Sequence, residues 1–206
     1  MSERAFLEAD AKRRATEAIR ELEGQTSAEL VVSVRLAAER HVATSLVFGA
    51  AVAALGLVVM LVSPQVYDVR TMPLEALVSF VLAALACHFL PPLRRVLTPK
   101  RRRVEAARRG ALRAFTELGV EKTKQRSGVL VFVALFERTA VVVADEGVPA
   151  ALLGEAWSTH VAGLDERVAA RDFEGFLTHL LGFGPVLAAV LPRRPDDANE
   201  LADEVA

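Results

Sequence analysis

Two long apolar segments constrain the fold of this chain more than any other feature. Residues 42–62 contain no charged side chain, and residues 74–93 carry only Glu75 and His88, each near one end. About 20 apolar residues in a helix match the hydrocarbon thickness of a bilayer. The alternative is a pair of buried helices in a soluble protein, but both segments lack the polar face that such helices usually have. The sequence therefore predicts a transmembrane hairpin over residues 41–93.

Basic residues lie mainly on one side of this predicted hairpin. The connector between the spans holds only Arg70. A dense run follows the second span: Arg94, Arg95, Lys100, Arg101, Arg102, Arg103, Arg108 and Arg109. The positive-inside rule then predicts a multi-pass membrane protein with both termini in the cytoplasm. Beside a span, we expect the Arg94–Arg109 run to contact anionic lipid head groups in the bilayer rather than nucleic acid.

The segment before the hairpin, residues 1–40, predicts one helix and one strand. Apolar residues recur at helical spacing and Gly24 offers a stop. These apolar positions are Leu7, Ala11, Ala15, Ala18, Ile19 and Leu22. The β-branched run at residues 29–35 then predicts a strand. This segment is the first part of a soluble domain.

The segment after the hairpin, residues 94–191, predicts a helix, two strands and two further helices. The strands are expected at residues 128–135 and 140–144, as a hairpin. Residues 192–206 are Pro-rich and then acidic, and we expect them to be extended or disordered. The order of elements predicts an α/β fold with a small central β-sheet flanked by helices.

One strand cannot form a sheet alone, so the strand at residues 29–35 needs a partner. An even number of spans keeps residues 1–40 and 94–191 on the same side of the membrane. The simplest arrangement joins this strand to the later strands across the insertion. We therefore expect a single α/β domain interrupted by the hairpin.

Several motifs follow one another in the soluble part. They are Gln25–Glu29, Gly119–Val133, Glu137–Arg138, Val143–Gly147, Trp157 and Leu191–Leu201. In order and spacing the sequence resembles a membrane-inserted branch of the TPM domain family, which includes thylakoid-lumen acid-phosphatase-like proteins and photosystem repair factors. The resemblance implies an α/β sandwich and, as for some relatives, a divalent cation site or weak phosphatase activity. One departure is Ala28, where the family usually has glycine.

Asp145 and Glu146 form the strongest candidate for a metal site. They follow a predicted strand and precede Gly147, and carboxylate oxygens are ligands that Ca²⁺ or Mg²⁺ prefers. Glu29 joins them if the two strands are neighbours. The alternative interpretation is a solvated turn, because Asp and Gly are ordinary turn residues.

Other residue types with chemical potential are scattered. Trp157 is expected in the core, and Arg126–Gly128 is expected to be a loop rather than a phosphate cradle. His160 and His179 lie on apolar helix faces without the spacing of a zinc site. The single cysteine, Cys87, excludes an internal disulfide.

Three functions fit this sequence. The first is a non-enzymatic binding or accessory module on the cytoplasmic face, which the lack of any complete catalytic motif favours. The second is a divalent-metal-dependent phosphatase that uses Asp145, Glu146 and Glu29. The third is an oligomeric membrane assembly factor, in which the glycines Gly49 and Gly56 allow contact between hairpins of a homo-oligomer or with a protein partner.

Overall fold

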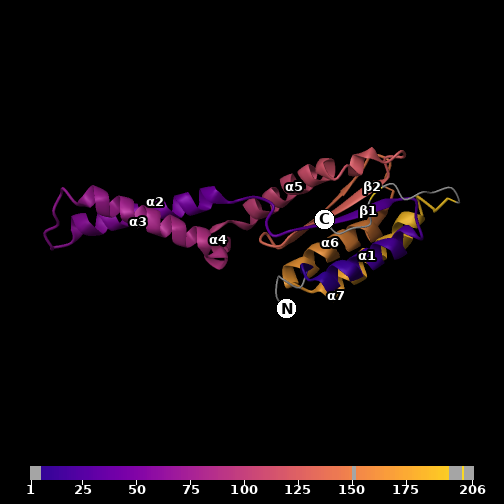
Figure 1. The fold of residues 1–206 in the computed structure, drawn as a ribbon, viewed down its shortest axis with the longest axis horizontal. Helices are drawn as coiled ribbons and strands as arrows, with labels where there is room; N and C mark the ends of the chain where they lie inside the picture. The colour runs from indigo at the N-terminus through magenta and orange to yellow at the C-terminus, as the bar shows by residue number, and fades with distance from the viewer. Residues whose placement is uncertain (1–5, 150–151, 195–200, 202–206) are drawn as a thin grey trace. The chain divides into compact units, whose positions relative to one another are not determined.

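A computed structural model describes residues 6–149, 152–194 and 201. The fold is mixed α/β and consists of two compact units (Figure 1). One unit contains the described residues up to Glu39 and from Arg103 onward, and the other is Arg40–Arg102. The two halves of the predicted soluble domain therefore belong to one unit, and the hairpin belongs to the other.

The α/β unit contains its elements in the expected order. They are α1 (Ala9–Glu23), β1 (Glu29–Arg35), α5 (Lys100–Glu117), the 3₁₀ turn η2 (Val120–Lys122), β2 (Gly128–Ala134), β3 (Thr139–Ala144), α6 (Gly154–Ala170) and α7 (Phe173–Ala188). Asp172 caps α7, because its side chain accepts a hydrogen bond from the backbone N–H of Gly175.

The strands form one sheet in the order β1-β2-β3. β1 pairs with β2 in parallel, from Glu29 opposite Gly128 to Arg35 opposite Ala134. This pairing confirms that the strand before the hairpin joins the strands after it. β2 and β3 pair in antiparallel, as the predicted hairpin requires. Every residue of β2 is buried, which explains why this strand is apolar throughout instead of alternating.

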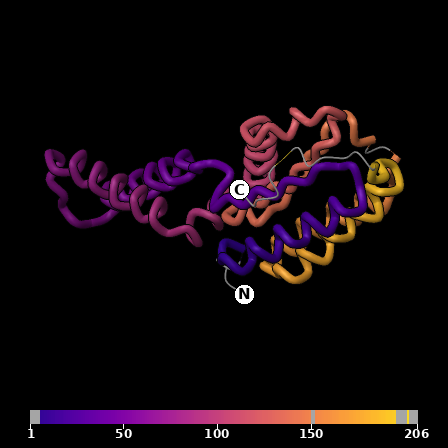
Figure 2. Tube along the Cα trace, turned by 45° about the vertical axis from the view of Figure 1, so that its right-hand side comes forward, coloured from indigo at the N-terminus to yellow at the C-terminus, as the bar shows by residue number. Residues whose placement is uncertain are grey.

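Helices cover both faces of the sheet: α5 lies on one face, and α1, α6 and α7 lie on the other (Figure 1). Alternate residues of each strand separate into these two cores. Leu30 and Val131 join the core under α1, α6 and α7. Val31 and Phe132 join the core under α5. Figure 2 shows α1 beside α7, which brings segments from opposite ends of the chain together.

The hairpin unit contains α2 (Val42–Val62), α3 (Met72–Phe89) and the short helix α4 (Pro91–Leu97). α2 and α3 run side by side (Figures 1 and 2). They approach closely at Gly49, where an added Cβ would lie 2.7 Å from the backbone oxygen of Phe80 and 2.9 Å from Cβ of Ala84. Gly56 has no atom within 4 Å of such a Cβ. Gly49 therefore allows the close approach of α2 and α3 within the hairpin.

The second apolar segment differs from its prediction. One helix was expected over residues 74–93, but α3 ends at Phe89 and α4 begins at Pro91. The two prolines lack backbone N–H groups, so they end the first helix yet fit the first turn of the next. The hairpin unit accordingly extends to Arg102 rather than ending at residue 93.

The beginning of the predicted tail pairs with the loop before β1. Thr26 forms an isolated antiparallel bridge with Pro192, and the backbone N–H of Ser27 donates to the oxygen of Leu191 at 3.0 Å. The tail was predicted to be extended or disordered from Pro192 onward, and Pro192 is extended and paired. Residues 195–200 and 202–206 lie outside the described part of the chain.

Replacing Gly49 with leucine should open the hairpin. The new side chain would collide with Phe80 and Ala84 on α3. Cys87 on α3 is fully buried and is the only cysteine, so its reaction with a thiol reagent in detergent micelles measures this opening. We expect faster labelling of Cys87 in Gly49→Leu and an unchanged rate in the matched control Gly56→Leu. Equal rates in the two variants would contradict the observed packing.

Candidate functional site: the β3 edge groove

β3 has one paired edge and one open edge. Within the described residues, only β2 pairs with it. The backbone N–H of Asp145 donates to the oxygen of Gly128 at 2.9 Å, whereas the N–H of Ala140 donates away from the sheet to Asp165 Oδ1 at 3.0 Å. In an antiparallel pair, alternate residues point their backbone groups to opposite sides. The backbone groups of Ala140, Val142 and Ala144 therefore face outward.

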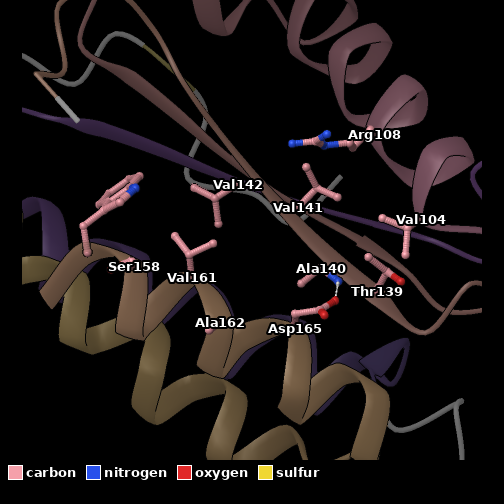
Figure 3. A pocket seen from close by; sticks show the side chains of 11 residues that line it. Val104, Arg108, Thr139, Ala140, Val141, Val142, Ser158, Val161, Ala162 and Asp165 are labelled. Carbon is pink, nitrogen blue, oxygen red and sulfur yellow. Dashed lines mark hydrogen bonds between the residues drawn. The ribbon is translucent and has the colours of Figure 1, made fainter. Parts of the chain in front are cut away.

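This open edge forms the floor of a groove with a volume of about 480 Å³, which is within the roughly 300–1,000 Å³ typical of ligand pockets. Val104 and Arg108 of α5 line one side, and Val161 and Asp165 of α6 line the other (Figure 3). Trp157 of α6 also lines the groove. We call this the β3 edge groove. Its walls are mainly apolar, as is usual for binding pockets.

One charged group of each sign borders the β3 edge groove. Asp165 accepts a hydrogen bond from the Ala140 N–H, which Figure 3 marks with a dashed line. Arg108 is exposed, and its guanidinium has no hydrogen-bond or ion-pair partner among residues 6–149, 152–194 and 201. The groove thus combines an apolar surface, outward backbone groups and an available cation.

The Asp145 corner lies at the end of β3. The Asp145 carboxylate is buried, with 3% of its side chain exposed, and Oδ1 lies 2.9 Å from Nη2 of Arg126. Oδ1 also accepts from the backbone N–H of Glu146 at 2.8 Å. Oδ2 has no hydrogen-bond partner in the described chain. Glu146 is 86% exposed and lies 3.7 Å from the same arginine. A cation at Oδ1 would have to displace Arg126.

Glu29 does not join this corner directly. β1 and β3 lie on opposite sides of β2, so the condition that their strands be neighbours is not met. Glu29 is paired with Gly128 and accepts a hydrogen bond from the backbone N–H of Leu201 at 3.4 Å. Within the described ranges, no group of three or more His, Cys, Asp or Glu is placed to hold a metal ion. Glu29, Asp145 and Glu146 thus do not form a ready metal cluster.

Two other predicted loops have structural roles. The hydroxyl of Ser127 donates to the backbone oxygen of Ser27 at 3.2 Å, and Arg126 is held by Asp145. The hydroxyls of Thr26 and Ser27 donate to the oxygens of Leu191 and Pro192, at 2.6 and 2.8 Å. The Thr26 hydroxyl also accepts a hydrogen bond from the backbone N–H of Ala28 at 3.2 Å, so it makes a local contact as well as a long-range one. These contacts fasten the loops before β1 and β2 to each other and to the end of α7.

Trp157 belongs to both the core and the groove. Its ring meets Phe183 of α7 edge to face, with centroids 4.8 Å apart. It packs against the main core while remaining partly exposed, and it lines the β3 edge groove. The expected core role is confirmed, and the contribution to the groove was not predicted.

His160 and His179 lie next to each other, a contact that the sequence analysis did not predict. Their rings lie 5.7 Å apart between α6 and α7. A Cβ at Gly182 would overlap the His160 ring, and one at Gly163 would overlap the His179 ring. The spacing His-x-x-Gly occurs in both helices, at 160–163 and 179–182, and this repeat was the available signal. Burial and the neighbouring His179 lower the pKa of His160 below its ordinary value.

Comparisons with known proteins inform the fold only. No family model matches the chain, and no curated protein matches it. A solved structure, the NMR structure of BA42 protein from the psychrophilic bacterium Bizionia argentinensis sp. nov., is similar with a TM-score of 0.57 and 18% sequence identity. The match covers 98% of this chain and 94% of that one. At this identity the likeness is one of fold.

We expect Asp145→Asn to destabilise the α/β unit by about 1–3 kcal/mol, because it removes a buried charge-assisted hydrogen bond and leaves Arg126 with only the exposed Glu146 as an ion-pair partner. The neighbouring control Glu146→Gln should cost less than about 1 kcal/mol, since that carboxylate is exposed. Thermal unfolding followed by the fluorescence of Trp157, the only tryptophan, measures both. Adding Ca²⁺ or Mg²⁺ tests the cation hypothesis in the same assay. A rise in Tm in the wild type that Asp145→Asn abolishes would support it.

The stability of the α/β unit should decrease in mild acid. The pKa of His160 is lower in the folded chain than its ordinary value of about 6.5. The unfolded chain therefore binds the proton first, and stability falls as the pH drops below about 6.5. We expect His160→Gln to reduce the loss of Tm between about pH 7.5 and 5.5. His41→Gln, a change in the hairpin unit, is the control and should keep the full loss.

Proposed function

We propose that this chain is an integral membrane protein with a TPM-like α/β domain, and that it acts as a non-enzymatic binding module at the cytoplasmic face. In this proposal α2 and α3 cross the bacterial inner membrane as a hairpin. The α/β unit is assembled from the segments on either side of the hairpin and binds a partner through the β3 edge groove.

The exposure of α2 and α3 supports the membrane part of the proposal. Both helices are long and apolar enough to span a bilayer, and only 11% of the most apolar window of each is buried. Leu61 and Val62 of α2 and Leu82 of α3 are among the large apolar side chains that are more than half exposed. Water would strongly disfavour a surface of this size and composition. A lipid environment removes that cost.

The distribution of basic residues supports the proposed orientation. Lys100, Arg101 and Arg102 are exposed and have no ion-pair partner within the described chain. They follow α4, which itself begins two residues after α3. Available cations close to the end of a membrane helix favour the cytoplasmic side and the anionic head groups there. Arg109 differs, because Glu39 and Glu105 pair with it.

The β3 edge groove is the observation that carries the binding function. It combines apolar walls from two helices, outward backbone groups from a strand and the unpaired guanidinium of Arg108. These groups suit recognition of a ligand by shape, hydrogen bonds and charge. None of them needs to change covalently for a ligand to bind.

Cysteine labelling in intact cells tests the topology. With Cys87 changed to Ala, a new cysteine at Gln65, in the connector between α2 and α3, should react with a membrane-impermeant thiol reagent added outside spheroplasts. The matched variant with cysteine at Glu155, an exposed position of α6, should react only after lysis. Reaction at Glu155 in intact spheroplasts would reverse the proposed orientation. Extraction of the protein by carbonate would contradict membrane integration.

A further inference from the structure

We infer that the β3 edge groove binds an extended peptide, which adds a fourth strand to the sheet beside β3 and places an acidic side chain against Arg108. This inference rests on the proposed role as a binding module and specifies the chemistry of the partner. The added strand would extend the present order β1-β2-β3 on its open side.

The backbone supplies the first part of the argument. Ala140, Val142 and Ala144 direct their N–H and C=O groups away from β2, as the alternation of the antiparallel pair requires. Asp165 already accepts from the Ala140 N–H, so the described chain satisfies one end of the edge. The N–H groups of Val142 and Ala144 have no partner among the described residues. An extended chain satisfies such groups directly.

The composition of β3 supplies the second part. Proteins usually protect an exposed strand edge with lysine, proline or a bulge, since an unprotected edge pairs with other chains. Thr139–Ala144 contains no charged residue and no proline, and it pairs with β2 without a bulge. Edge protection of this kind is therefore missing from a strand that lies in a groove.

The walls of the groove define the side chains of the peptide. A residue opposite Val142 would point toward α6, where Trp157 and Val161 offer an apolar surface. Its neighbours in the peptide would point toward α5, where Arg108 has no partner in the described chain (Figure 3). Because side chains alternate along a strand, the favoured sequence has apolar residues at every second position and a carboxylate between them.

The recessed position of the edge favours a single peptide over a second copy of this chain. β3 lies between α5 and α6, which form the two walls of the groove. In a second copy the same edge lies between the same two helices. The helices of the two copies would meet before their strands came within the 4.7–4.9 Å that pairing requires. One extended chain has no such walls.

Selection of peptides on the full-length chain in lipid nanodiscs tests this inference. The probe is a phage-displayed library of random peptides of about seven residues, close to the usual length of a strand. We expect enriched sequences in which apolar residues alternate with Asp or Glu. A synthetic enriched peptide should lose binding at least tenfold when its backbone amides are N-methylated, because methylation removes the strand hydrogen bonds. An empty selection, or equal binding of the methylated peptide, would overturn the inference.

Two variants locate the bound peptide. Val142→Pro removes an outward N–H and should abolish binding, and its Trp157 unfolding transition checks that it remains folded. Arg108→Glu leaves the backbone unchanged and lies on an exposed helix face, so it keeps the test decisive if the proline variant unfolds. We expect Arg108→Glu to weaken binding of the acidic peptide several-fold. The same variant should bind more tightly a peptide that has Lys in place of the acidic residues. Unchanged peptide binding in Arg108→Glu would overturn the placement of the acidic side chain against Arg108.

The remaining outcomes separate this inference from the proposed function. If the wild type forms a dimer and Val142→Pro dissociates it, the groove binds a second copy of this chain. That result would overturn the inference that the groove binds a peptide. If the selection yields no peptide but the cysteine labelling is as expected, the inference of peptide binding is overturned. The proposed membrane topology then still stands. Peptide binding by a chain with the reversed labelling would support the groove and overturn the cytoplasmic location.

Discussion

The parallel pairing of β1 with β2 is the contact on which the α/β unit depends. It joins a strand that precedes the hairpin to one that follows it, over seven residues of each strand. Without it, β1 would lack a partner and the core under α1, α6 and α7 would lose Leu30 and Val32. The pairing also limits what can be inserted between the strands. The two ends of any insertion must return to positions from which β1 and α5 reach the same sheet.

The two edges of this sheet are treated differently. On the outer side of β1, the backbone N–H of Leu30 donates to Glu23 Oε1 at 2.9 Å, and nearby Ser27 is tied to Leu191 and Pro192. On the outer side of β3, Asp165 satisfies the first N–H and the apolar run continues beyond it. Each edge thus has one strand N–H held by a carboxylate of the chain, and the β3 edge differs because it lies in a groove between two helices. This asymmetry is why binding is assigned to β3.

Local patterns in the sequence were sufficient to predict most elements. The helical spacing before Gly24 gave α1, and the β-branched run at 29–35 gave β1 with its observed bounds. The requirement that a strand have a partner was sufficient to predict the split sheet, in which β1 pairs with β2 across the insertion. The prediction of a single helix over residues 74–93 missed the new helix that begins at Pro91, in a first helical turn where proline fits.

The site was less predictable, because it depends on neighbours that sequence does not specify. The order of strands decides whether Glu29 meets Asp145, and β2 lies between their strands. The hydrogen-bonding side of Val142 depends on register, and the walls from Val104 and Trp157 depend on how α5 and α6 pack. The repeated His-x-x-Gly spacing is the sequence pattern that accompanies the contact of His160 with His179. It predicts that contact only if α6 and α7 are already known to pack together.

The separation of β1 from β2 in the chain also sets an order of events during synthesis. Glu29 pairs with Gly128, so at about 5–20 residues per second the ribosome needs roughly 5–20 s to make the second strand after the first. Both apolar helices emerge within that interval. The nascent β1 must therefore stay unpaired until residues 42–89 have been synthesised, and the α/β unit can complete its sheet only after the whole hairpin has left the ribosome.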